Sequence, residues 1–571
     1  MKNSKRQAGI EVLGCALLAL LVPAALMAAE AKPAPASLNL PAGAEQAAKA
    51  IDRESLEAPI RHLSDDKLEG RGPSSRGDEM ARQYLADSLK SLGYQPGAAD
   101  GSWQQAVSIV GITSAVPKTW DFKTGDKTVA LKYWDDFIGA SGVQAPTSSI
   151  RNAELVFVGY GIEAPEYQWN DFKGMDLKGK VIVMMNNDPD WDPKLFEGNR
   201  RLYYGRWTYK YESAARQGAA AAIIIHTTPS AGYPWQVVQT SWSGEQFELP
   251  AAGEPRIQVA AWTTEDAARK LFAAAGQDLA KLVQQAKNRS FKPVPLGITT
   301  SLEMANKITQ VKTGNVLGRL EGSDPKLKDE VVLYSAHHDH LGIGEPDKEG
   351  DKIYNGAIDN AAGCAQLLAI AKAFTKLPQR PKRSILISFV AAEEQGLLGS
   401  EYLAAHPPVP AGKIAANINY DGGNMLGRTS DLTYIGLGKS SLDNVVRGLA
   451  QRQGRKVLGD QFPDRGFFYR SDQFNFAKIG VPAIYLEGGT AYIGKPKEWG
   501  KQQMEDYEEH RYHQPSDEYD PKWTYDGIIE DAQIGFYAGL SIAETPQLPA
   551  WNPGDEFEAA RKKALAAVQG K

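Results

Sequence analysis

The chain has 571 residues, of which 42% are hydrophobic and 23% are charged. This length exceeds what one hydrophobic core usually organises, so we expect two or more domains. The formal net charge of −5 excludes the strongly basic balance that is typical of proteins that bind nucleic acid.

The first 29 residues predict a signal peptide. A basic segment with Lys2 and Arg6 precedes an apolar run over 12–29, and small residues follow it. An uncleaved membrane anchor is the first alternative. A lipoprotein box ending at Cys15 is the second, although this residue precedes most of the apolar run. We expect an exported protein, periplasmic or secreted in a bacterium. No other segment reaches the roughly 18 apolar residues of a membrane span, so no stable membrane insertion is expected after cleavage.

Residues 30–44 are rich in Ala and Pro and predict a linker. Residues 45–144 form the first part of the main domain, with apolar residues between 80 and 92 mostly three or four apart, as in a helix. Residues 145–295 then alternate between apolar strands and helices without a cluster of candidate ligands. We expect this segment to be a separate, smaller α/β unit.

Residues 296–548 alternate between strand and helix again. This pattern predicts an α/β fold with a mostly parallel mixed sheet flanked by helices. Most of the candidate ligands follow a predicted strand directly, which is where open α/β sheets place their sites. The tail over 549–571 predicts a surface helix or a frayed end. The expected strands cover 331–334, 384–390, 414–420 and 481–486.

Five short stretches carry the imidazole and carboxylate groups that zinc and similar ions bind. Each stretch alone also has an ordinary interpretation, such as a helix cap or a solvated loop. Together they supply enough ligands for a pair of metal ions, and such a pair can activate water at neutral pH. The set therefore predicts hydrolysis. The stretches are His337 to His340, Asp359-Asn360, Glu393-Glu394, Asp421 and Tyr512-His513.

The first stretch holds three imidazoles and one carboxylate. Asp339 lies two residues after His337, where a carboxylate can orient the imidazole from behind. His338 and His340 are further candidates. Neighbours in an extended segment point in opposite directions, so we expect one ligand from this stretch.

The adjacent pair Glu393 and Glu394 follows the most β-rich strand of the chain. Two neighbouring carboxylates repel each other unless a cation offsets their charge. One of them can ligate a metal while the other moves protons.

In order and in residue type, the five stretches resemble the motifs of the M28 family of co-catalytic zinc peptidases, over roughly residues 50–545. None of the five ligands is substituted. The segment near 145–295 resembles a protease-associated domain inserted into the peptidase domain. The matching motifs are Ala336-His337-x-Asp339, Gly356-Ala357-x-Asp359-Asn360, Glu393-Glu394-Gln395-Gly396, Asn419-x-Asp421 and His513-x-x-Ser516-Asp517.

The resemblance implies two zinc ions per chain and a cis peptide bond between Asp359 and Asn360. It also implies that Glu393 is the general base. Its implied ligands are His337 and Asp421 for one ion, Glu394 and His513 for the other, and Asp359 for both. For Tyr512 it implies a hydroxyl that stabilises the tetrahedral intermediate, and for Arg470 a contact with a substrate carbonyl or carboxylate.

The activity implied by the resemblance is that of an exported aminopeptidase, with peptides as substrates. Carboxypeptidase, dipeptidase and glutaminyl cyclase are alternatives within the same superfamily. A metal-free binding module is the remaining alternative, and the intact ligand set argues against it. The pattern defines no oligomeric state.

Overall fold

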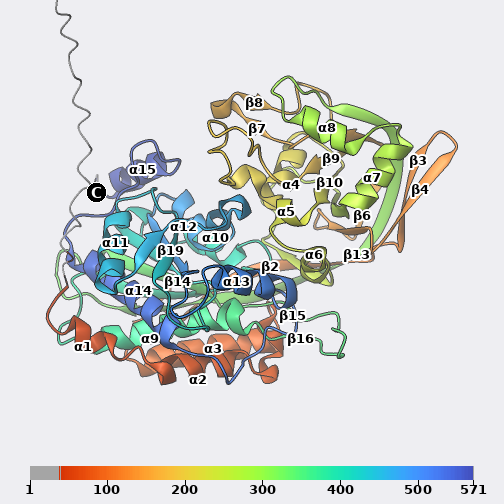
Figure 1. Ribbon diagram of the computed structural model, residues 1–571. Helices are drawn as coiled ribbons and strands as arrows, with labels where there is room; N and C mark the ends of the chain where they lie inside the picture. Colours follow the sequence, from red (N-terminus) through yellow and green to blue (C-terminus); the bar gives the residue numbers. More distant parts are fainter. Residues whose placement is uncertain (1–37, 39, 570–571) are drawn as a thin grey trace, which may run out of the picture.

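The computed structural model describes residues 38 and 40–569, which form two lobes (Figure 1). The predicted signal peptide and most of the predicted linker lie outside the described residues. The larger lobe contains the helices α1 (Ala44–Ala48), α2 (Arg53–Leu63) and α3 (Arg76–Ser91) and nearly all of the chain after residue 305. Within the described residues, no helix combines the length and apolar character required to cross a membrane.

The centre of the larger lobe is a mixed sheet. Its four central strands lie parallel in the order β17, β14, β18, β21, and antiparallel strands extend the sheet on both sides. This arrangement confirms the predicted α/β fold with a parallel sheet centre. The strands are β2 (Gln104–Ser114), β13 (Val294–Leu320), β14 (Val331–His337), β17 (Ser384–Val390), β18 (Ile414–Asn419), β19 (Asp431–Ile435), β20 (Lys456–Leu458) and β21 (Ala483–Gly488).

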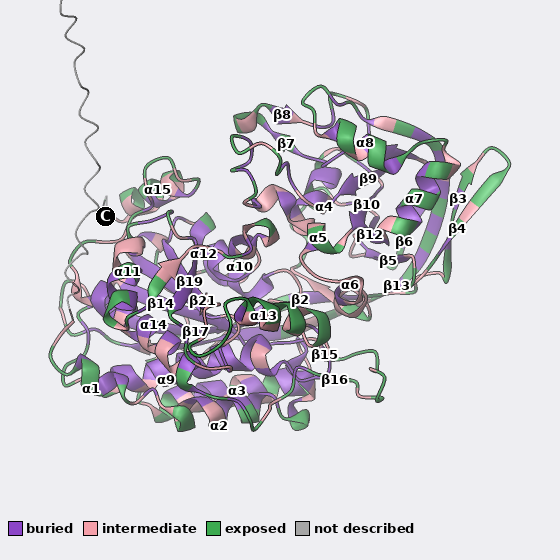
Figure 2. Ribbon diagram, viewed as in Figure 1, coloured by how far each residue is buried: buried purple, intermediate pink, exposed green. Residues whose placement is uncertain are grey.

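Helices cover both faces of this sheet, so every residue of β14, β17 and β18 is buried (Figure 2). Strands buried on both faces are apolar along their whole length rather than alternating, as these are. One face carries α9 (Gly363–Thr375), α14 (Asp526–Glu544) and α3, which packs on β13, with α2 packed beyond α9. The other face carries α10 (Leu398–Ala405) and α12 (Gln473–Lys478). The tail forms α15 (Glu558–Gln569), and its buried Arg561 donates to the backbone oxygen of Ile414 over 2.9 Å.

The smaller lobe has a sheet of its own. Four neighbouring strands lie parallel in the order β6, β9, β10, β12, with β5 antiparallel at one edge and β13 at the other. The elements are β3 (Thr119–Thr124), β4 (Lys127–Lys132), β5 (Phe137–Ser141), β6 (Thr147–Phe157), β9 (Val181–Met185), α4 (Trp207–Arg216), β10 (Ala221–His226), β12 (Val259–Thr264), α7 (Glu265–Ala274) and α8 (Leu279–Ala286).

The strands β3, β4 and β5 lie before residue 145, in the segment that the sequence analysis assigned to the main domain. They pair within the smaller lobe instead, β3 with β13 and β5 with β12. The first boundary of the insert therefore lies near residue 115 in this structure. The change in composition near residue 150 marks the first parallel strand of the smaller lobe rather than its beginning.

Two segments hold the lobes together. The 27-residue strand β13 pairs with β6 in the smaller lobe through Val294 to Ala305, and with β2 in the larger lobe from Asn306 onward. A second segment leaves the smaller lobe as α6 (Trp235–Ser241) and continues as β11 (Glu245–Glu248). Strand β11 pairs with β2 of the larger lobe, so the smaller lobe contributes backbone to the larger sheet.

Candidate metal centre and active site

The predicted ligands converge at the carboxyl ends of the central strands. His337 ends β14, the pair Glu393-Glu394 follows β17, and Asp421 follows β18. Asp359 lies in the buried turn that precedes α9, and its peptide bond to Asn360 is cis. His513 follows α13 (Trp499–His510).

One cluster of ligand atoms surrounds the imidazole of His337. Its Nε2 atom lies 3.2 Å from Oδ1 of Asp421 and 3.2 Å from Oδ1 of Asp359. Its Nδ1 atom faces the backbone oxygen of Asp339 at 3.2 Å. A proton on Nδ1 is therefore bound by the backbone, which leaves the Nε2 lone pair for a cation.

A second cluster surrounds His513. Its Nε2 atom lies 3.0 Å from Oε2 of Glu394 and 3.3 Å from Oδ2 of Asp359. The two carboxylate oxygens of Asp359 thus face two different imidazoles. Burial opposes ionisation of Asp359, yet the neighbouring imidazoles of His337 and His513 hold the pKa of its carboxyl well below the ordinary value.

His340 belongs to the same cluster, although the sequence analysis expected one ligand from its stretch. It is fully buried, and its Nδ1 atom lies 2.7 Å from Oε1 of Glu394. Strand β14 ends at His337, so the alternation of an extended segment does not continue to His340. His338 points elsewhere and lies 2.9 Å from Oδ1 of the buried Asp78.

These buried atoms fit a cation. Although they lie close together, Nε2 of His513, Oε1 of Glu394 and both ring nitrogens of His340 have no hydrogen-bond partner among the described residues. Buried polar atoms normally find such partners, and a group of exceptions facing one another is typical of an ion site. Imidazole and carboxylate are ligands that zinc accepts. The residues present therefore suit the ions that the family resemblance implies.

Glu393 lies beside the first cluster, with Oε2 4.0 Å from Nε2 of His337. Burial, together with the negative charges of Asp421 and Glu394, raises the pKa of its carboxyl well above the ordinary value, against the opposite influence of His337.

Asp339 has a different contact from the expected one. Its Oδ1 atom is 3.8 Å from Nδ1 of His337, beyond hydrogen-bond distance. Its carboxylate instead accepts the backbone N–H groups of Glu393 over 3.1 Å and of Glu394 over 3.4 Å. Asp339 therefore holds the turn that presents the two glutamates, and the imidazole of His337 is oriented by backbone.

Tyr512 and Arg470 lie next to each other at the wall of the same cavity. The guanidinium of Arg470 donates to the hydroxyl of Tyr512 over 3.3 Å. It also lies over the rings of Phe467 and Tyr233, 5.2 and 5.3 Å from their centres. Tyr233 belongs to the smaller lobe, so Arg470 is held between the two lobes.

The smaller lobe also reaches the second cluster, which the sequence analysis did not foresee. The hydroxyl of Ser241, the last residue of α6, lies 2.7 Å from Nδ1 of His513. Nearby, the side-chain amide of Gln236 donates to the backbone oxygen of Glu509 over 2.7 Å. In Figure 1, α6 lies between the smaller lobe and α13.

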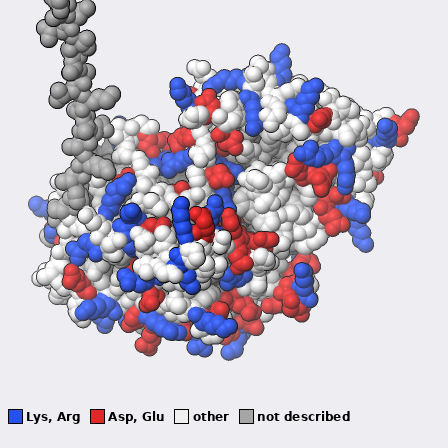
Figure 3. Space-filling model, viewed as in Figure 1, with Lys and Arg blue, Asp and Glu red and all other residues white. Residues whose placement is uncertain are grey.

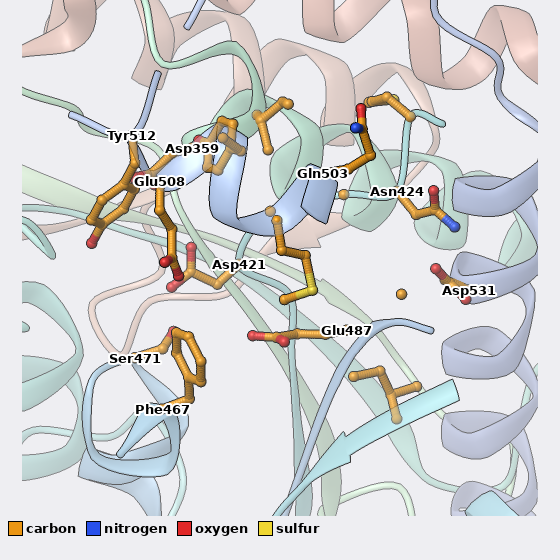
Figure 4. A pocket seen from close by; sticks show the side chains of 18 of the residues that line it. Asp359, Asp421, Asn424, Phe467, Ser471, Glu487, Gln503, Glu508, Tyr512 and Asp531 are labelled. Atoms are coloured by element: carbon orange, nitrogen blue, oxygen red, sulfur yellow. The ribbon is translucent and has the colours of Figure 1, made fainter. Parts of the chain in front are cut away.

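A cavity of about 250 Å³ opens beside the two clusters. Asp359, Glu393, Glu394 and Asp421 line one end, and Figure 4 shows it continuing past Asp421 to Glu487 and Asn424. An α/β fold with buried imidazole and carboxylate clusters beside a cavity is an arrangement that metal-dependent hydrolases use.

Part of the chain matches a known protein family. The family model described as "Peptidase family M28" matches residues 315–536. A "Probable zinc metalloprotease" of Pyrenophora teres f. teres is 35% identical over 114 residues, which are 20% of this chain and 23% of the relative. The resemblance drawn from the motifs is therefore confirmed over residues 315–536, which match the M28 peptidase family. The chain spans about a quarter or less of the length of the curated relatives it matches.

Two solved structures are similar over most of the chain. The aminopeptidase from Aneurinibacillus sp. strain AM-1 is 20% identical, with a TM-score of 0.49, over 88% of this chain and 95% of the other. A peptidase M28 precursor from Shewanella amazonensis is 19% identical, with a TM-score of 0.48, over 89% and 98% of the two chains.

The predicted location is wrong on these comparisons. A relative from Saccharomyces cerevisiae bears the name "Vacuolar membrane protease". It is 33% identical over 168 residues, which are 29% of this chain and 15% of the relative. This name contradicts the expectation of a bacterial protein exported to the periplasm or the medium. A basic segment before an apolar run also occurs in membrane-anchored chains, so the pattern alone does not define export.

Proposed function

We propose that this chain is an aminopeptidase with two zinc ions, which removes N-terminal residues from peptides. The observation that carries the proposal is the convergence of all five predicted ligands and Glu393 on one cavity. His337 and Asp421 would hold one ion, Glu394 and His513 the other, and Asp359 would contribute one oxygen to each. When bound, two zinc ions supply the Lewis acidity that polarises a scissile carbonyl and makes water acidic.

Glu393 acts as the proton carrier of the reaction. It lies next to the ligands without being needed as one, and its raised pKa suits a group that accepts a proton near neutral pH and returns it. It takes a proton from the attacking water and passes it to the leaving amine. Asp339 keeps Glu393 in place through the backbone hydrogen bonds of the turn.

Tyr512 and Arg470 act on the substrate carbonyl. The hydroxyl of Tyr512 accepts a hydrogen bond from Arg470, so its own proton is free to point into the cavity. A hydroxyl donor placed where negative charge develops lowers the barrier of acyl transfer.

The cavity's charges favour an aminopeptidase over a carboxypeptidase or a dipeptidase. A free terminal carboxylate needs cations, and of the charged residues that line the cavity seven are acidic and two are arginines. A free α-ammonium suits this environment. Arg470 is the one observation that supports the alternative.

The smaller lobe fits the proposal of an inserted protease-associated domain, and we place that insert between about residues 115 and 305.

Replacement of Glu393 by Gln tests the mechanism, because it keeps the shape of the side chain and removes its proton acceptor. We expect two zinc ions per chain, measured by elemental mass spectrometry, and a loss of turnover of roughly 100-fold or more. The control is the exposed Glu321, which directly follows β13. Glu321→Gln is expected to leave turnover unchanged. Normal turnover in metal-loaded Glu393→Gln would exclude Glu393 as the proton carrier.

A panel of aminoacyl p-nitroanilides, each beside its N-acetylated form, tests the specificity. Chelator-sensitive cleavage of the free-amine forms alone is the expected result. Cleavage of N-blocked peptides from the carboxyl end would favour the carboxypeptidase alternative.

A further inference from the structure

The cavity beside the metal clusters extends to a second carboxylate, Glu487. This residue lies near the end of β21, and Figure 4 shows its side chain directed into the cavity, on the far side of Asp421 from Tyr512. None of the five motifs contains it, and it takes no part in the two ligand clusters.

The cavity also has apolar walls. Met425, Leu426, Trp523 and Met504 of α13 are among the residues that line it. Such walls suit a flexible aliphatic chain, which loses its contact with water along its length while its end reaches Glu487.

Glu487 differs from the other acids of the cavity in its partners. The other acids lining the cavity beyond the clusters are paired: Glu508 forms an ion pair with Arg465, and Asp531 lies 2.6 Å from Arg455. Glu487 has no ion-pair partner among the described residues. Burial and the neighbouring Asp460 and Asp421 raise its pKa to about 8. A half-buried carboxyl that faces a cavity beside other acids gains free energy when a cation enters.

The outer surface beside the cavity also favours a cationic ligand. Helix α13 forms one wall of the cavity and carries Glu505, Asp506, Glu508 and Glu509. Figure 3 shows acidic side chains gathered on this side of the molecule. A negative entrance raises the local concentration of cationic substrates and speeds their arrival.

We propose that Glu487 receives the cationic end of an N-terminal Lys or Arg side chain, so that the preferred substrates are peptides with a basic first residue. This inference rests on the proposed aminopeptidase function and specifies its substrate class. The aliphatic part of the side chain lies against the apolar walls, and its ammonium or guanidinium group donates to the carboxylate of Glu487.

The kinetic test compares p-nitroanilides of Lys, Arg, Leu and norleucine. The parent protein is expected to prefer Lys and Arg. Glu487→Gln lowers kcat/KM for Lys and Arg roughly 10- to 100-fold, as expected for a hydrogen bond to a charged group, and leaves norleucine unchanged. Glu321→Gln removes the same charge from an exposed residue that does not line the cavity and serves as the matched control. Equal losses for all four substrates would mean that Glu487 binds the α-ammonium, and would overturn the proposal, as would a parent protein without preference for basic residues.

A binding test separates this inference from the proposed function. Calorimetry with zinc-loaded Glu393→Gln measures the affinity for Lys-Ala and for norleucyl-Ala without turnover. Tighter binding of Lys-Ala that disappears in Glu393→Gln/Glu487→Gln supports the role of Glu487, and equal binding of the two dipeptides overturns it. A parent protein that cleaves none of the amides overturns the aminopeptidase proposal, while the calorimetric result still decides the role of Glu487. Unchanged zinc content and thermal unfolding of Glu487→Gln show that the substitution acts locally.

Discussion

The hydroxyl of Ser241 lies 2.7 Å from Nδ1 of His513, although 272 residues separate them in the chain. Ser241 ends a helix that the smaller lobe extends to the larger one, and His513 is a proposed zinc ligand. When Nε2 of an imidazole binds a metal, the proton sits on Nδ1 and needs an acceptor. The smaller lobe would therefore provide part of the support of the proposed metal site.

Ser241→Ala tests this relationship. Removing the acceptor leaves the Nδ1 proton of His513 without a partner. The affinity of His513 for its proposed zinc ion should then fall. We expect the dissociation constant of one of two zinc ions to rise roughly 10- to 100-fold, measured by titration with a competing chelator. Ser243, two residues further on, contacts only a backbone oxygen, so Ser243→Ala is the control. Equal zinc affinities in the two variants would show that the contact contributes nothing to the site.

His340→Asn tests whether the third imidazole serves the metal site. Its ring faces Glu394 and has no hydrogen-bond partner among the described residues, so its role is to face a cation. We expect the variant to lose the more weakly bound zinc at chelator concentrations at which the parent protein keeps two.

His338→Gln is the contrasting variant for His340, since His338 pairs with the buried Asp78 instead. Breaking that pair is expected to cost roughly 3 kcal/mol of unfolding free energy while leaving the zinc stoichiometry at two. Loss of zinc in His338→Gln and retention in His340→Asn would reverse the two assignments.

The larger lobe's sheet and the convergence of the five ligands could be predicted because both follow from local patterns. Apolar strands such as Val331–His337 alternate with helices, and parallel strands bring their carboxyl ends to one edge. The role of His340 could not be predicted, because the alternation rule fails where a strand ends. The contact of Ser241 with His513 could not be predicted, because nothing in the sequence relates this serine to a histidine so far away in the chain. The insert's first strands, β3 and β4, were missed because they form a hairpin of half-exposed residues.

Asp171 makes the stability of the smaller lobe depend on pH. It is almost fully buried, and burial raises the pKa of its carboxyl to about 7 from an ordinary value of 3.8. The folded state therefore keeps a proton that the unfolded state releases above pH 4. Its contribution to stability is present below pH 4, falls as the pH rises to 7 and stays constant above that.

Asp171→Asn removes this dependence and keeps an oxygen that can accept the N–H of Ile162, now bonded over 2.9 Å. The difference in unfolding free energy between variant and parent is expected to grow in favour of the variant between pH 4 and 7. Its upper bound is roughly 4 kcal/mol. Thermal unfolding at several pH values measures it, and a difference that does not change with pH would contradict the burial of an ionisable carboxyl.

Gly539→Ala tests the packing behind the metal site. A Cβ atom at this position of α14 would lie 1.8 Å from the hydroxyl of Tyr334, which is fully buried and donates to the backbone oxygen of Gly535 over 2.8 Å. Tyr334 has no room to move, and it stands three residues before His337 on β14. We expect the unfolding free energy of the variant to be roughly 1–3 kcal/mol lower than that of the parent, because overpacking forces the strand and the helix apart.

Gly448→Ala in α11 (Leu442–Arg452) is the matched control, since its Cβ atom would meet only Leu38 at 3.4 Å, an ordinary contact. Alanine is the better helix former, so this variant should gain up to about 1 kcal/mol. The two glycines thus predict opposite signs for the same substitution. If displacement of Tyr334 reaches the end of β14, Gly539→Ala also binds zinc less tightly. Equal stabilisation in both variants would mean that Tyr334 can leave its position without cost.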